Sequence, residues 1–270
     1  MRAAVVGHVE WIEFVEVDTV PLPGEIVAAS SSWEEVAGGG AVAALQLAQL
    51  ADETLLFTSL GRDELGRRAE GELRAGGVGV HAAWPADSQR RAICHVDERG
   101  ERTITVLGDK LRPRGDDGDL PWEELEHVDA AYFVSGDAAA LRQARRAPVL
   151  VATARELATL KLGGVELDAL VGSGEDEGER FQAGDLDSQP QLVVTTSGGL
   201  GGWAQPGGPF QAAAPPGPVE DAYGCGDCFA AGLTYALARG LAVTDALGFA
   251  ARCGAAALTG RGVHAARVDL

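Results

Sequence analysis

The stretch that decides the fold lies near the end of the chain and reads Asp221-Ala222-Tyr223-Gly224-Cys225-Gly226-Asp227-Cys228-Phe229-Ala230-Ala231-Gly232. Two glycines flank one small residue, and an acidic residue and an Ala/Leu-rich run follow. Because glycine adopts backbone angles that other residues avoid, Gly224 and Gly226 predict a tight turn into a helix whose first N–H groups are unpaired. Such a helix start attracts anions. The stretch therefore predicts an anion site with Asp227 in the first helical turn.

A carboxylate beside an anion site can accept a proton from an alcohol while the site stabilises a transferring phosphoryl group. Asp227 is therefore the candidate catalytic base, and Gly224, Cys225 and Gly226 are the candidate anion site. The alternative for Asp227, taken alone, is an ordinary helix N-cap. The position of Cys225 at a helix start also predicts a thiol with a lowered pKa, sensitive to oxidation or alkylation.

Upstream of this stretch, short apolar runs alternate with Ala- and Leu-rich runs. Strands are predicted at 3–6, 54–58, 130–134, 149–151, 169–171 and 192–195, and helices at 41–50, 64–75, 138–145, 155–160, 227–239 and 244–258. Continuous apolar runs are typical of strands buried on both faces. The alternation predicts an α/β fold with three layers, in which helices cover a doubly wound, mostly parallel sheet.

Two pairs of segments break this alternation. They are residues 11–17 with 25–32, and 92–97 with 103–107. Apolar and polar residues alternate along each, which is typical of half-buried strands, and 98–102 reads as a hairpin turn. We therefore expect one domain over 1–270 with a small β lid contributed by about 10–34 and 90–108. The alternative is that these strands extend the edge of the main sheet.

Composition excludes several classes of partner. The 270-residue chain carries a net charge of −18, which argues against nucleic-acid binding and against anionic membrane surfaces. A local pocket can still be positive. The sequence has neither an apolar run of the roughly 18 residues that span a bilayer nor a signal-peptide pattern, so a cytoplasmic protein with a small-molecule substrate is expected. Four cysteines are too few for a disulfide scaffold, and Cys225 and Cys228 lack the second ligand pair of a zinc site.

The stretch 221–232 resembles the second signature of the PfkB family of carbohydrate kinases, an Asp, two variable residues, Gly-small-Gly-Asp and a helix with Phe and Ala-Gly. Other pieces follow in that family's order over nearly the whole chain. They are the glycines 38–40 before an Ala-rich helix, 61–66 with 76–78, the hairpin at 100–104, and the turn 196–201. The resemblance implies a ribokinase-like fold.

The resemblance also implies roles for individual residues. Asp227 would be the base, and Gly224, Cys225 and Gly226 would bind the γ-phosphate of ATP, with Mg²⁺ as a further cofactor and a monovalent cation left open. On the nucleotide side it implies Thr196, Gly198, Gly201, Ser173 and Asp221. On the acceptor side the candidates are Gly38, Gly39, Glu10, Val42 and Asp137. For Asp137, which follows a predicted strand, the alternative is a helix N-cap.

Three positions depart from the family pattern. The family's Asn after the glycine pair falls at Val42 or Ala43, and its Asp after the first strand falls near Ile12, beside Glu10 and Glu13. The loss of both polar contacts argues against a ribose-like acceptor. The family's Asn-x-x-Glu motif aligns with the segment 173–176, where Asp176 and Glu175 are the candidates to hold a metal-bound water; the alternative is a solvated acidic loop.

The sequence thus predicts an ATP-dependent phosphotransferase whose acceptor is an alcohol group of a sugar, nucleoside or related small metabolite. The alternative is a kinase-fold protein that binds a ligand or regulates, with little activity. In the family, lid strands can also mediate a homodimer. Arg102 and Arg112 are candidates to steer phosphates, or else ordinary surface arginines. A Rossmann-type dehydrogenase is excluded, because only Gly7 follows the first strand where three glycines are needed.

Overall fold

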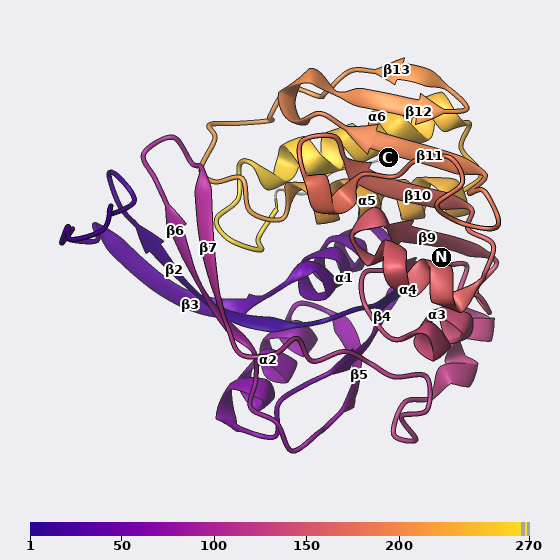
Figure 1. The fold of residues 1–270 in the computed structure, drawn as a ribbon, viewed down its shortest axis with the longest axis horizontal. Helices are drawn as coiled ribbons and strands as arrows, with labels where there is room; N and C mark the ends of the chain where they lie inside the picture. Colours follow the sequence, from indigo (N-terminus) through magenta and orange to yellow (C-terminus); the bar gives the residue numbers. More distant parts are fainter. Residues whose placement is uncertain (266–267, 269–270) are drawn as a thin grey trace.

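The main sheet forms the centre of the molecule in this computed structural model, which describes residues 1–265 and 268. Within those residues it has nine strands in the order β13-β12-β11-β10-β9-β8-β1-β4-β5 (Figure 1). Their bounds are β1 Arg2–Val6, β4 Glu53–Ser59, β5 Val78–Ala83, β8 Ala130–Phe133, β9 Val149–Thr153, β10 Ala169–Ser173, β11 Leu192–Thr196, β12 Gly202–Gln205 and β13 Gly208–Phe210. The pairs from β5 to β11 are parallel, and β12 and β13 add an antiparallel edge.

Helices cover both faces of this sheet. One face carries α1 (Gly39–Leu50), α2 (Glu64–Ala75), α5 (Cys225–Ala238) and α6 (Val243–Ala257), and the other carries α3 (Ala138–Ala144) and α4 (Leu157–Gly163). Short 3₁₀ turns lie at η1 Trp122–His127, η2 Ala154–Glu156, η3 Glu177–Glu179 and η4 Gly198–Leu200. Each face has its own buried apolar cluster, because the side chains of a strand alternate between the faces. The predicted three-layer α/β fold is confirmed.

A second, four-stranded sheet stands beside the main sheet (Figure 1) and is called the small sheet here. Its order is β3 (Ser31–Ala37), β2 (Glu10–Glu16), β6 (Arg91–Val96), β7 (Arg102–Leu107). The inward face buries Ile12 and Phe14 against Tyr223 and Val42 of the main body. The small sheet is separate, so the strands do not extend the main-sheet edge.

The second strand of the small sheet lies further along the chain than predicted. The sequence pattern placed it at 25–32, whereas β3 runs over 31–37 and Ile26 is fully exposed. The alternation of apolar and polar residues in 25–32 therefore does not mark a half-buried strand. The prediction also lacked β5, β12 and β13, which are short strands of mixed composition. Within the described residues, no helix is long and apolar enough to cross a membrane.

Candidate active site

Asp227 lies in the first turn of α5, at the carboxyl ends of the parallel strands. Gly224 adopts a left-handed conformation (φ 75°) and begins the helix, and no described side chain caps it. A Cβ placed on Gly39 would lie 2.9 Å from Oδ1 of Asp227 and 2.9 Å from Cγ1 of Val134, which follows β8. Gly39 and Asp227, which are far apart in sequence, are therefore in direct contact, and a larger residue at 39 would displace the carboxylate.

The carboxyl group of Asp227 has an unusual proton affinity. Burial, and secondly the negative charge of Glu179, raise its pKa from 3.8 to about 6, against the opposing pull of Arg102 and Arg155. A base works best when its pKa lies near the working pH, since it is then both deprotonated and basic enough to accept a proton. The environment of Asp227 fits that requirement better than it fits a solvated N-cap.

The turn before α5 is suited to an anion. Gly226 is exposed, and a Cβ there would meet no described atom within 4 Å, so the turn is open on its outer side. Cys228 N donates to Gly224 O at 2.9 Å, which leaves the earlier N–H groups of the 14-residue helix without helical partners. These open donors are compatible with the anion site that the sequence predicts at this turn.

The glycine loop before α1 is held by contacts from two directions. Gly38 (φ 88°) donates its N–H to the hydroxyl of Tyr223 at 2.9 Å. Gly40 N donates to His8 O at 3.1 Å, and a Cβ on Gly40 would lie 2.5 Å from that oxygen. Tyr223 also packs edge-on against Phe14 of the small sheet, with 5.1 Å between ring centroids. Its role as a link was not predicted, because only the fold reveals a contact across 185 positions.

The two apolar residues that depart from the family pattern, Ile12 and Val42, pack in the core. Val42 is buried in α1, and a Cβ on Gly224 would lie 2.8 Å from its Cγ1. Ile12 is buried in the same cluster as Phe14. Val42 thus packs beneath the anion turn instead of lining an open pocket, and neither side chain brings a polar group to an acceptor.

Next to the glycine loop, polar groups come from the chain around β2. Glu10 is buried, pairs with Arg90 Nε at 3.0 Å and lies 3.7 Å from His8 Nε2. Burial raises the pKa of Glu10, although the positive charge of Arg90 opposes this. Burial, and secondly the charge of Lys110, hold the pKa of His8 well below its usual range. Glu10 also lies against the glycine loop, because a Cβ on Gly38 would lie 3.1 Å from its Cγ.

Asp137 is a helix cap. Its Oδ1 accepts from Ala140 N at 2.7 Å and from Gly115 N at 3.0 Å, so it fixes the start of α3 and the preceding loop. It also lines a cavity of about 590 Å³ together with Ser59, Trp84 and others. The N-cap alternative is therefore the observed one, and the carboxylate is already engaged by backbone groups.

The residues predicted on the nucleotide side gather at the ends of two neighbouring strands. Ser173 ends β10 and Thr196 ends β11, and these residues are register partners. Gly198 (φ 49°) and Gly201 (φ 93°) form the following turn. A pocket at the carboxyl ends of parallel strands is where α/β proteins bind ligands. Four of the five predicted nucleotide-side residues are therefore brought together.

Asp221, the fifth, has a different role. Its side chain is buried, Oδ1 accepts from Tyr223 N and Oδ2 accepts from Gly262 N, each at 2.7 Å. Burial raises its pKa, while these two bonds oppose the rise. The carboxylate connects the turn before α5 to the loop after α6. Both of its oxygens are engaged by backbone N–H groups, so Asp221 has a structural role instead of the predicted contact with the nucleotide.

The acidic residues near β10 do not form a metal cage. Asp176 pairs with Arg155 at 2.6 Å and accepts from Gly178 N, and Glu175 lies against Gly198. Across residues 1–265 and 268, no three His, Cys, Asp or Glu side chains are grouped as metal ligands. Magnesium bound with a nucleotide takes one or two carboxylates plus phosphate oxygens and waters, so scattered single carboxylates still fit it.

Glu179 is the acidic residue of this region that matters to Asp227, and the sequence did not single it out. It accepts from Ser173 N at 3.0 Å and pairs with Arg155, and among the charged groups it has the largest effect on Asp227. The acidic run 175–179 indicated carboxylates at this loop, but only the fold decides which one acts on the base.

The expected activation of Cys225 is wrong. Burial raises the pKa of its thiol to about 11, against the opposing positive charge of Arg102. Cys228 is buried in the same helix, and all four cysteines are free. The Cys-x-x-Cys spacing is therefore a packing feature of α5.

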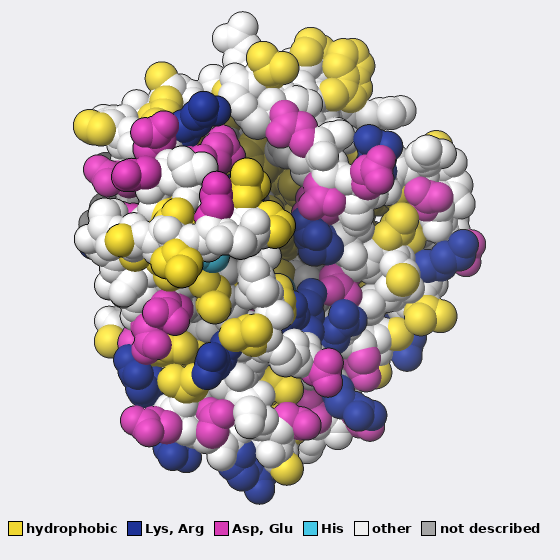
Figure 2. Space-filling view, turned by 60° about the vertical axis from the view of Figure 1, so that its left-hand side comes forward, with side chains coloured by type: hydrophobic (Ala, Val, Ile, Leu, Met, Phe, Trp, Pro, Cys, Tyr) yellow, Lys and Arg dark blue, Asp and Glu magenta, His cyan; other side chains and the backbone are white. Residues whose placement is uncertain are grey.

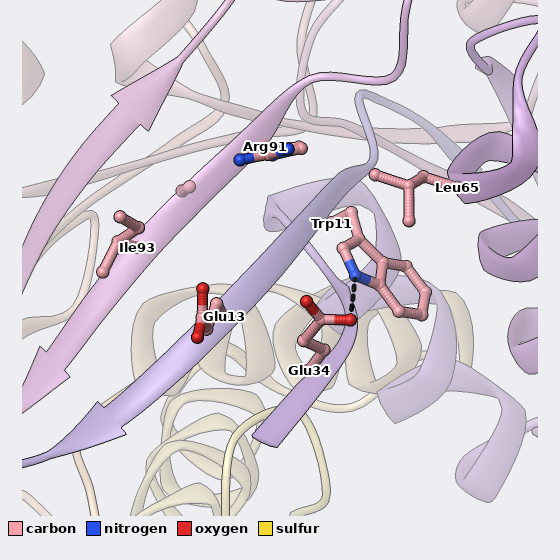
Figure 3. A pocket seen from close by; sticks show the side chains of 7 residues that line it. Trp11, Glu13, Glu34, Leu65, Arg91 and Ile93 are labelled. Atoms are coloured by element: carbon pink, nitrogen blue, oxygen red, sulfur yellow. Dashed lines mark hydrogen bonds between the residues drawn. The ribbon is translucent and has the colours of Figure 1, made fainter. Parts of the chain in front are cut away.

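Away from Asp227, the small sheet has a hollow of about 160 Å³ on the face that meets Leu65 of α2. There Trp11 Nε1 donates to Glu34 Oε2 at 3.3 Å, beside Glu13 and Arg91 (Figure 3). Side chains alternate along β2, so Trp11 and Glu13 point away from the face that carries Phe14. This hollow is separate from Asp227.

Comparison with known proteins places this site in a family. Residues 2–159 and 147–269 match the model of the pfkB family carbohydrate kinase. The chain belongs to this family. No curated protein sequence matches it. The resemblance seen in the signature at 221–232 is thereby confirmed for nearly the full chain.

Solved structures share the fold of this pfkB-family chain at low sequence identity. A microbiome-derived acarbose kinase is 23% identical with a TM-score of 0.81, covering 99% of this chain and 95% of its own. The Thermotoga maritima ribokinase is 18% identical with a TM-score of 0.75, covering 97% and 94%. The Arabidopsis thaliana ribokinase, solved with ribose and ATP, is 20% identical with a TM-score of 0.71, covering 96% and 93%. At these identities the likeness establishes the fold.

Proposed function

We propose that this carbohydrate kinase transfers the γ-phosphoryl group of ATP to an alcohol group of a sugar, nucleoside or related small metabolite, with Asp227 as the base. The observation that carries the proposal is the contact between Gly39 and Asp227 at the open start of α5. That contact brings the glycine loop at 38–40 next to Asp227 and the turn at 224–226, which supports these three parts acting together. The ATP found with the Arabidopsis ribokinase supports the choice of nucleotide.

Each part of the chain has a distinct role in this proposal. Gly39 has no side chain to displace the carboxylate of Asp227, which takes the proton of the accepting hydroxyl. The N–H groups at 224–226 stabilise the negative charge of the phosphoryl group during its transfer. ATP supplies that group, and Mg²⁺ neutralises phosphate charge when bound. The turn 196–201 and the end of β10 hold the nucleotide.

We further propose that the small sheet acts as a lid. Val106 and Ile104 of β7 pair with Ala92 and Cys94, so they share the inward face, yet they are exposed while Ala92 and Cys94 are buried. Closure over an acceptor would bury these apolar side chains and exclude water from the transfer. Arg102 lies on the same strand, and its charge acts on Asp227.

The test is ATP turnover by the purified protein across a panel of sugars, nucleosides and related alcohols, measured as ADP release. Acceptor-dependent turnover is expected, and Asp227→Asn is expected to lower kcat by about 10²–10⁴-fold while ATP binding stays nearly unchanged. Ligand binding without turnover across the panel would favour the alternative of a binding or regulatory protein, and near-normal turnover by the variant would refute the role of Asp227.

A further inference from the structure

The loop after α6, residues 259–264, lies between the small sheet and the turn that begins α5. Gly262 of this loop donates its N–H to Asp221 Oδ2 at 2.7 Å, and Val263 donates its N–H to Glu35 Oε1 at 3.1 Å. Asp221 comes just before α5, whereas Glu35 belongs to β3 of the small sheet. Two adjacent backbone groups of the loop are therefore bound by buried carboxylates from two different parts of the molecule.

Gly262 is the residue at which these two contacts meet. Its φ of 63° lies in the left-handed region, which favours glycine, and a Cβ at this position would overlap with Oε1 of Glu35. The carboxylate of Glu35 therefore packs directly against the backbone of the loop, and a larger residue at 262 would displace it. His264 Nε2 lies 3.3 Å from Oε2 of Glu35, so the loop contacts both oxygens.

Aromatic side chains form a second connection from the same loop to the glycine loop. Cζ of Arg261 lies 3.7 Å from the centre of the Trp33 ring, and Trp33 stacks on Phe14 with 4.9 Å between ring centroids. Phe14 packs edge-on against Tyr223, whose hydroxyl accepts from Gly38 N. The loop after α6 is thus connected to the glycine loop through the small sheet as well as through the turn before α5.

The hairpin between β6 and β7 contacts the segment before α5 as well. Gly100 O accepts from Ala222 N at 3.1 Å, and a Cβ on Gly100 (φ 75°) would lie 3.1 Å from Glu220 O. Leu258 O accepts from Glu220 N at 2.8 Å. The segment before α5 therefore takes its position from the small sheet as well as from the end of α6.

The contacts of Glu35 lie at the edge of the small sheet that is fixed to this loop. In the sheet order β3-β2-β6-β7, the strand of Glu35 forms one edge and the exposed strand β7 forms the other. Arg261 also donates to Ser31 Oγ, at the start of β3, at 2.8 Å. Figure 2, in which the side of the molecule that carries the small sheet comes forward, shows a hollow down the middle of this face. A lid that closes over a hollow needs a fixed edge, because reacting groups have to be held within about 0.5 Å of their productive geometry.

A carboxylate is a costly choice for the position of Glu35. Burial raises the pKa of Glu35, and the hydrogen bond from Val263 N opposes the rise. A well-packed apolar side chain would avoid this cost, but it would leave the N–H of Val263 without its acceptor. The hydrogen bond to the loop is what a carboxylate at this position provides.

We infer that Glu35 is a positioning residue for phosphoryl transfer, which holds the anion turn (224–226) and the glycine loop in place next to Asp227 through the loop after α6. It acts through Asp221 and Tyr223 and not on the reacting groups themselves. The inference rests on the proposed kinase function and adds a residue to it. Because Glu35 belongs to the small sheet, the seating of the lid becomes a condition for an ordered anion turn.

The first test is ADP release by Glu35→Ala in the full chain, with an acceptor that the parent phosphorylates. We expect kcat to fall by about 10–100-fold, because a displacement of about 1 Å caused far from the chemistry can cost about 100-fold. The KM of ATP should change by less than about 2-fold, because the predicted nucleotide turn at 196–201 is held by its own backbone hydrogen bonds.

Two further variants of β3 serve as rescue and control. Glu35→Gln keeps an oxygen that accepts from Val263 N and should retain most of kcat. Glu34→Ala removes a paired carboxylate from the opposite face of the same strand and should leave kcat unchanged. A parent-like kcat in Glu35→Ala, or an equal loss in Glu34→Ala, would overturn the inference.

Gly262→Ala separates positioning from a general loss of stability. In the parent, the new Cβ overlaps with Glu35 and should lower kcat about as much as Glu35→Ala does. In Glu35→Ala the overlap is gone, so Gly262→Ala should lower kcat by less than about 3-fold further. Thermal melting confirms that each variant is folded at the assay temperature. Losses that multiply would show that the two residues act independently, and the inference would be wrong.

A measurement that needs no turnover keeps this inference distinguishable from the kinase function. Amide hydrogen exchange in Glu35→Ala should be faster at 221–226 and 36–40 and unchanged along β4. If these changes occur but the parent phosphorylates no acceptor, only the proposed kinase function fails. Unchanged exchange at 221–226, with turnover by the parent, overturns the positioning role alone.

Discussion

Replacement of Asp227 by Asn should inactivate the enzyme and stabilise its fold at the same time. The carboxylate has a pKa raised from 3.8 to about 6, chiefly by burial and then by Glu179, so its ionised form is disfavoured in the folded state. Because the folded-state pKa exceeds the unfolded value, the contribution of this group is present below about pH 4 and is lost as the pH rises through about 6. Asn has no charge to bury and escapes this loss.

The size of the effect follows from the two pKa values. A rise of roughly two pH units corresponds to about 3 kcal/mol, at about 1.4 kcal/mol for each unit. The variant should therefore be more stable than the parent by about 3 kcal/mol at about pH 8, and by about half as much at about pH 5.

The assay is urea unfolding followed by circular dichroism at several pH values, with the parent, Asp227→Asn and Asp18→Asn. Asp18 is exposed in the turn after β2, so its replacement serves as the control and should leave stability nearly unchanged. If Asp227→Asn is no more stable than the parent at about pH 8, burial does not disfavour the ionised carboxylate of Asp227. The same conclusion follows if the difference in unfolding free energy between the two proteins is as large at about pH 5 as at about pH 8.

Three further predictions concern turnover. The kcat/KM of the parent should fall about tenfold per pH unit below about pH 6, as Asp227 becomes protonated, and a flat acid limb would contradict the assigned base. Gly39→Ala should lower kcat by about 100-fold, because the new Cβ would lie 2.9 Å from Asp227 Oδ1; Gly71→Ala, where a Cβ meets no described atom within 4 Å, should leave turnover intact. Tyr223→Phe should lower the unfolding free energy by about 1–2 kcal/mol and raise the acceptor KM, because the Gly38 N–H loses its buried acceptor, and an unchanged melting temperature with unchanged KM would refute that link.

Much of the fold follows from local pattern. The apolar runs that became β1, β4 and β8 to β10 are largely buried on both faces, and a continuous apolar run records that burial directly. The helices over 39–50 and 64–75 follow in the same way. The short strands β5, β12 and β13 were not predicted, because three to six residues of mixed composition carry too little periodic signal.

The candidate site likewise has features that follow from local sequence and features that depend on tertiary contacts. The sequence by itself determined the turn at Gly224 and Gly226 and the place of Asp227 in the first turn of α5, since glycine freedom and helix-start chemistry are local properties. Only the tertiary structure decided that Gly39 touches that carboxylate and that the charge of Glu179 acts on it. Proton affinity and charge complementarity depend on burial and on distances between residues remote in sequence, and those distances exist only once the sheet has assembled.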